Sequence, residues 1–108
     1  MIPTTIKLAG HNVPVRILPT RVGSSNAEYD TWNNAITLSD THLQSPDIQE
    51  QTFCHEILEL MIEQSGLRYY LQQHDSSTSG HIREQICQSL ENIFWRFLKD
   101  ETNFFEEK

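Results

Sequence analysis

The stretch SPDIQEQTFCHEILELMIEQSG, Ser45–Gly66, decides the fold class of this chain. Ser45 is a residue type that caps the N-termini of helices, and Pro46 suits the first helical position because it needs no backbone donor there. Gly66 is the residue type that most often ends a helix, since it adopts the left-handed backbone conformation without strain. Seven apolar residues between Phe53 and Ile62 cover one broad arc of a helix wheel. The stretch therefore predicts a long helix over residues 46–65.

A second helix is predicted over residues 81–100. Its apolar residues recur at intervals of three and four, which is the spacing of one helix face. These residues are Ile82, Ile86, Leu90, Ile93, Phe94 and Phe97. The segment 67–80 between the two helices ends in a Ser/Thr/Gly-rich run and is predicted to be a loop, and residues 101–108 form a tail.

The N-terminal part, residues 4–39, has the pattern of two β-hairpins. Gly10-His11-Asn12 and Asn33-Asn34 are turn-forming groups between runs rich in residues that favour strands. The predicted strands are Thr5–Leu8, Val13–Leu18, Glu28–Trp32 and Ala35–Leu38. Pro14 lacks a backbone donor, so its strand should lie at an edge or pair on one side only at that point. We thus expect an α+β fold, a small antiparallel sheet of two hairpins packed on two main helices.

The length and net charge of the chain restrict the number of domains and the kinds of partner that we expect. The chain has 108 residues, of which 37% are hydrophobic, so we expect one domain. Fifteen acidic and eight basic residues give a net charge of −7, so no nucleic-acid partner is expected. No apolar run is long enough for a membrane span and no secretory signal is visible, which favours a cytoplasmic protein. Cys54 and Cys87 lie within apolar helical patterns and are predicted to be buried, reduced thiols.

The chemistry-bearing residues of the first helix are His55, Glu56 and Glu59. At about 100° per residue, Glu59 projects about 40° from His55, one turn further along the helix, and Glu56 projects about 100° from it. His55 and Glu59 are thus placed as two ligands of one metal ion would be. Glu56 follows the first ligand, where a general base for a metal-activated water is placed.

The same residues have a simpler interpretation. His55, Glu56 and Glu59 belong, with Thr52 and Glu63, to one polar stripe, and the solvated side of any amphipathic helix looks like this. Spacing alone therefore leaves a metal site and a plain solvated face as alternatives.

The order of these segments resembles a known family. A hairpin ending in Glu28-Tyr29-Asp30, the strand Ala35–Ser39, the motif Gln51–Glu59 and a last helix ending in Leu90–Asp100 are similar to small phage and prophage proteins of the minimal zincin metallopeptidase type. The likeness covers residues 5–100. Family members carry His-Glu-x-x-His or His-Glu-x-x-Glu on the first helix and a third metal ligand on the next helix.

This resemblance implies a zinc ion held by His55, Glu59 and a third ligand, with Glu56 as the base for a water that attacks a peptide bond. Alignment of the last helix places Glu84 at the third-ligand position. His81 is the alternative, because two histidines and one carboxylate suit zinc better than one histidine and two carboxylates. The resemblance also implies that a peptide substrate binds beside an edge strand at Ile36–Leu38.

One departure from the commoner family pattern leaves two functions open. Glu59 stands where most members have a second histidine. The chain is therefore expected to be a zinc-dependent metallopeptidase, in the host cytoplasm if phage-encoded. The alternative is a non-enzymatic acidic phage protein that keeps the scaffold and binds a host or phage protein.

Overall fold

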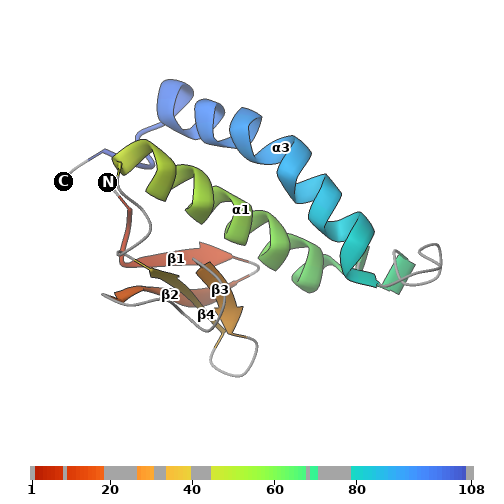
Figure 1. Cartoon of the computed structure of the whole chain (residues 1–108). Coiled ribbons are helices and arrows are strands. Elements are labelled where there is room, and N and C mark those ends of the chain that lie inside the picture. Colours follow the sequence, from red (N-terminus) through yellow and green to blue (C-terminus); the bar gives the residue numbers. More distant parts are fainter. Residues whose placement is uncertain are drawn as a thin grey trace.

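The computed structural model describes residues 2–8, 10–18, 27–30, 34–39, 45–67, 69–70 and 79–106. Three layers follow one another in Figure 1: a small β-sheet, the helix α1 (Pro46–Ser65) and the helix α3 (Ser79–Glu101). α1 lies in the middle and contacts the sheet as well as α3. The predicted α+β class is confirmed.

The sheet has the strand order β1-β2-β4-β3. Its strands are β1 (Thr5–Leu8), β2 (His11–Leu18), β3 (Ala27–Asp30) and β4 (Ala35–Ser39). The two outer pairs, β1 with β2 and β3 with β4, are antiparallel. β2 and β4 are parallel, with Val15 opposite Ile36. The expectation of an antiparallel sheet of two hairpins is therefore wrong at the centre, where a parallel pair joins the two antiparallel pairs.

The position of β4 corrects a second expectation. β4 pairs with β2 on one side and with β3 on the other, and all five of its residues are buried. Ile36–Leu38 is thus central and cannot accept an added strand. Pro14 behaves as expected: it faces Thr5 of β1, whereas the pairing of β2 with β4 begins only at Val15.

Both ends of α1 carry the caps that its sequence predicts. The Ser45 hydroxyl oxygen accepts a hydrogen bond from the backbone N–H of Ile48 at 3.2 Å, and Pro46 occupies the first turn. Gly66 has φ 82°, the left-handed conformation in which residues other than glycine are strained. The helix accordingly spans Pro46–Ser65, as predicted.

The main core lies between α1 and the sheet. Phe53 and Leu60 of α1 are fully buried against Ile36 and Leu38 of β4. Phe104 and Phe105, beyond the end of α3, fold back so that their ring centroids lie 6.2 and 6.3 Å from that of Phe53. Burial of this apolar surface fixes the face of α1 that contacts the sheet, and hence the face that is left for α3.

Polar pairs fix the register of the two antiparallel helices. Arg83 Nη1 lies 2.7 Å from Glu63 Oε1, Trp95 Nε1 donates to Glu50 Oε1 at 3.0 Å, and Lys99 Nζ lies 3.0 Å from Asp47 Oδ1. The twelve residues from Arg83 to Trp95 on α3 run opposite the thirteen from Glu63 back to Glu50 on α1, and the four from Trp95 to Lys99 run opposite the three from Glu50 back to Asp47. The polar pairs place the residues between Arg83 and Trp95 opposite the middle of α1.

Two further details of α3 differ from the prediction. It begins at Ser79, slightly earlier than expected. Its apolar stripe is only partly covered, since Leu90, Ile93 and Phe97 are 43%, 66% and 56% exposed. Within the described residues, neither helix is long and apolar enough to cross a membrane.

Candidate metal centre

The candidate centre lies where the middle of α1 faces α3. His55 and Glu59 of α1 project toward α3, and their side chains are 15% and 17% exposed. Glu84 of α3 meets them from the other helix, with its side chain 44% exposed. Since the opposite side of α1 is held by the apolar core, the polar stripe of α1 is the part that the second helix covers.

One nitrogen of His55 lies between two carboxylates. His55 Nε2 is 3.4 Å from Glu59 Oε1 and 3.1 Å from Glu84 Oε1. Glu59 is one turn along the same helix, whereas Glu84 comes from α3. The structure thus brings together three of the four residues that the sequence indicated as metal ligands.

The fourth, His81, lies in the first turn of α3. Its side chain lies outside the part of the chain whose side chains the structure describes. Of the two alternatives for the third ligand, only Glu84 therefore has a described position at the centre.

The other nitrogen of His55 has a partner that sequence reasoning missed. His55 Nδ1 lies 3.0 Å from Glu91 Oε2 of α3. A carboxylate that accepts a hydrogen bond from one ring nitrogen of histidine leaves the other nitrogen free to bind a metal. The available signal was the spacing on α3, because Glu84 and Glu91 are seven residues apart and so share one helix face.

Cys87 is a second residue that was missed as a candidate ligand. The ligand atoms of His55, Glu59 and Cys87 all lie within 4.8 Å of one another, so this group could hold a metal ion. Both cysteines are free and buried, as predicted. Burial, followed by the nearby charges of Glu59 and Glu84, raises the pKa of the Cys87 thiol to about 12. The thiol is therefore protonated at neutral pH when no metal is bound.

The carboxylates set the charge of His55. Its hydrogen bond with Glu59 raises the pKa of His55 to about 9, against the effect of burial, and the charge of Glu84 adds to the rise. Burial would raise the pKa of Glu59, but hydrogen bonds from His55 and Glu84 outweigh it and lower that pKa. Burial and the hydrogen bond to Glu59 raise the pKa of Glu84. A protonated imidazole is thus the positive charge that faces these carboxylates at neutral pH.

Glu56 is buried beside this group and is 5% exposed. Its Oε1 has no hydrogen-bond partner among the described residues. Burial, reinforced by the negative charge of Glu59, raises the pKa of Glu56 to about 8. A carboxyl group with a pKa near neutrality can both accept and release a proton at neutral pH, which is what a general base requires.

Comparison of the chain with protein-family models, with curated proteins and with solved structures finds no match.

Proposed function

We propose that this protein binds a zinc ion between α1 and α3 and hydrolyses peptide bonds, as a small zincin-like metallopeptidase of the phage type. The observation that carries the proposal is the position of His55 Nε2 within 3.4 Å of Glu59 Oε1 and 3.1 Å of Glu84 Oε1. Two helices contribute these three groups, and Glu56 is buried next to them with one oxygen unpaired among the described residues.

The residues fit zinc in chemistry and in spacing. Zinc in proteins binds imidazole nitrogen and carboxylate oxygen at about 2.0–2.2 Å in tetrahedral geometry, so two ligand atoms on one ion are roughly 3.3 Å apart. The two separations at His55 Nε2 lie on either side of this value. Several carboxylates crowd around one imidazole here, and a bound cation would relieve their mutual repulsion.

The preferred ligands are His55, Glu59 and Glu84. Three protein ligands leave one position open, as catalytic zinc sites require, whereas a fourth protein ligand closes the site. Cys87 is disfavoured because it would be a fourth protein ligand and would have to lose its thiol proton in a buried position. The preferred set predicts that Glu84→Gln weakens zinc binding far more than Cys87→Ser does. The reverse order would assign Cys87 as the third ligand.

Glu56 and Glu91, which are not zinc ligands, also have roles in the proposed reaction. A zinc ion at this site would supply a Lewis acid that makes water more acidic and polarises a peptide carbonyl. Glu56 would take a proton through its unpaired Oε1 and return it to the leaving amine. Glu91 would hold the His55 ring by accepting a hydrogen bond from Nδ1, so that Nε2 keeps its direction.

Metal content is the first test of the proposal. Untagged protein should contain about one zinc ion per chain by elemental analysis, and His55→Ala should abolish this signal. His11→Ala is the matched control, because His11 is exposed on β2. Metal-free protein that does not take up added zinc would reject the proposal and favour the non-enzymatic alternative.

Activity is the second test. Glu56→Gln should abolish cleavage of an internally quenched peptide library while leaving the zinc content unchanged. The substitution keeps the size of the side chain and removes its capacity to accept a proton. A Glu56→Gln variant that still cleaves the library would end the assignment of Glu56 as the base.

A further inference from the structure

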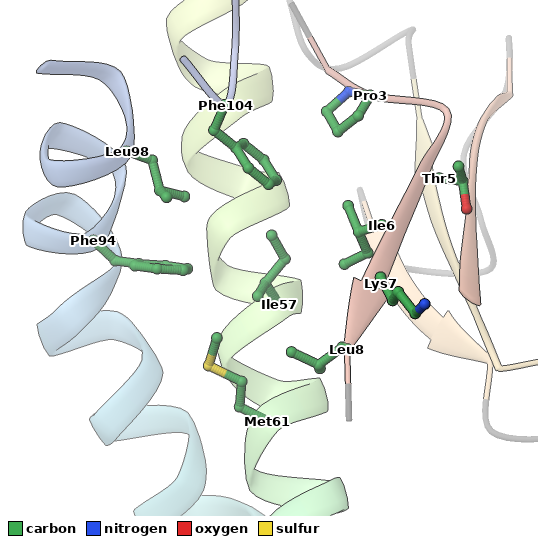
Figure 2. A pocket seen from close by; sticks show the side chains of 10 residues that line it. All are labelled: Pro3, Thr5, Ile6, Lys7, Leu8, Ile57, Met61, Phe94, Leu98 and Phe104. Atoms are coloured by element: carbon green, nitrogen blue, oxygen red, sulfur yellow. The ribbon is translucent and has the colours of Figure 1, made fainter. Parts of the chain in front are cut away.

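A second feature lies away from the metal centre, on another side of α1. It is an apolar groove of about 500 Å³ between β1, α1 and α3. Ile57 and Met61 of α1 line it and project about 160° and 120° away from His55 around the helix. Figure 2 shows Ile6 and Leu8 of β1 pointing toward these residues, with Phe94 and Leu98 of α3 on the far side and Phe104 above Ile57.

The groove runs along the edge of β1. Four consecutive residues, Thr5–Leu8, line it. Successive side chains of a strand point to opposite faces of the sheet, so a groove that touches all four must follow the edge, where the backbone groups lie. β1 is the terminal strand of the sheet on this side. No strand among the described residues pairs with β1 at this edge, so the groove combines apolar walls with an open backbone edge.

The hydrogen-bonding pattern shows which groups face this edge. Val15 N donates to Thr4 O at 2.9 Å, so Thr4 directs its backbone toward β2. Because hydrogen-bonded and non-hydrogen-bonded pairs alternate along an antiparallel ladder, Thr5 and Lys7 direct their N–H and C=O groups away from β2. Pro14, which has no N–H, is indeed the residue opposite Thr5. Two outward backbone pairs, at Thr5 and Lys7, are therefore offered to an added strand.

We propose that this groove binds an extended segment of a partner protein, which adds to the sheet as a strand beside β1. The side chains specify its chemistry. Lys7 carries the only charge among the ten lining residues, so an acidic residue is favoured opposite it. The residues on either side of that acidic one then point to the same face as Ile6 and Leu8, into the groove, and should be apolar. The partner pattern is an acidic residue between two apolar ones.

The size of the groove agrees with a short segment. A four-residue strand is roughly 13 Å long, and the groove volume lies within the range of about 300–1,000 Å³ that is typical of small-molecule sites. A second copy of the chain is a poorer occupant, since each copy carries a net charge of −7. The inference does not depend on the metal centre, and its test does not use activity.

The probe is the blocked pentapeptide Thr-Val-Glu-Val-Thr, which places glutamate opposite Lys7 in either strand direction. Titration into isotopically labelled protein should shift the amide signals of Thr5–Leu8 with a Kd below about 1 mM. The peptide with lysine in place of glutamate should bind about two- to fivefold more weakly, the size of one exposed charge pair.

Two variants separate backbone pairing from charge. Lys7→Pro removes an outward N–H and should reduce binding on the order of tenfold, whereas Lys7→Thr should reduce it only about two- to fivefold. If Lys7→Pro does not fold, Met61→Lys provides a second variant, because it places a charge in the groove from the 36% exposed Met61. Ile48→Lys is its control, since Ile48 is 48% exposed on α1 and does not line the groove.

Three results would overturn the proposal. The first is the absence of any shift at several millimolar peptide. The second is binding that Lys7→Pro and Met61→Lys leave unchanged. The third is a dimer of the free protein that Lys7→Pro dissociates, which would make a second copy the occupant of the edge.

Discussion

Glu91 Oε2 lies 3.0 Å from Nδ1 of His55, on the side of the ring opposite the nitrogen that meets Glu59 and Glu84. The imidazole is therefore held at both nitrogens by carboxylates from two helices. This arrangement fixes the direction of Nε2 before any ligand binds, and it makes Glu91 the positioning residue of the candidate centre.

Glu91→Gln is expected to weaken zinc binding by about 10- to 100-fold, which is the usual cost of losing such a partner. The fold should survive because Glu91 is 31% exposed and the substitution keeps its size. Competition with a chelator of known affinity measures the change. Glu101→Gln, at the exposed end of α3, serves as the control. Equal affinities of the Glu91 variant and the parent protein would show that Glu91 does not position His55.

Zinc binding should become tighter as pH rises toward 9. The pKa of His55 is raised to about 9 by Glu59 and Glu84, so the metal-free imidazole is protonated at neutral pH. Zinc needs the neutral imidazole, and binding at pH 7 must therefore release about one proton. Calorimetry in two buffers of different ionisation enthalpy counts this proton. Affinity that is flat between pH 6 and 9 would contradict a charged His55.

Removal of zinc should lower the thermal stability of the protein. A ligand that binds only the folded state at 100 times its Kd adds about 2.7 kcal/mol. For a domain of this size, that corresponds to a change in Tm on the order of 10 °C. A thermal melt with and without chelator measures it, and His55→Ala should show no difference between the two melts. A parent protein with the same Tm in the presence and absence of chelator would indicate that no zinc is bound.

Ser45→Ala should destabilise the fold by about 1 kcal/mol, since the Ile48 N–H loses the side-chain oxygen that caps α1. Urea unfolding measures the free energy of unfolding, and the slope with denaturant should not change. Ser45→Asp is the control, because aspartate caps equally well. An alanine variant as stable as the parent would mean that the cap contributes nothing to this helix.

The features that could be predicted from the sequence are those that depend on interactions between residues close together in the chain. Ser45, Pro46 and Gly66 each act through their own backbone or a neighbour three residues away, so both ends of α1 could be located from residue types alone. The side-by-side placement of His55 and Glu59 likewise depends only on the pitch of one helix.

The missed features depend on long-range pairing. The parallel contact of β2 with β4 joins segments that are about twenty residues apart, and no turn signal encodes it. Glu91 and Cys87 meet His55 and Glu59 only because α3 docks in one particular register on α1. That register is set by pairs such as Trp95 with Glu50, whose residues are 45 positions apart.

The register in which α3 packs on α1 limits which mutations the candidate centre can tolerate. The polar pairs Arg83 with Glu63, Trp95 with Glu50 and Lys99 with Asp47 share one register, and the candidate centre lies between the first two of them. Deletion of a single codon between Glu84 and Glu91 would turn the segment beyond it by about 100° relative to α1. Point substitutions can therefore change the candidate centre one residue at a time. Deletion of one codon within α3 would instead break all the contacts of α1 with the part of α3 beyond the deletion.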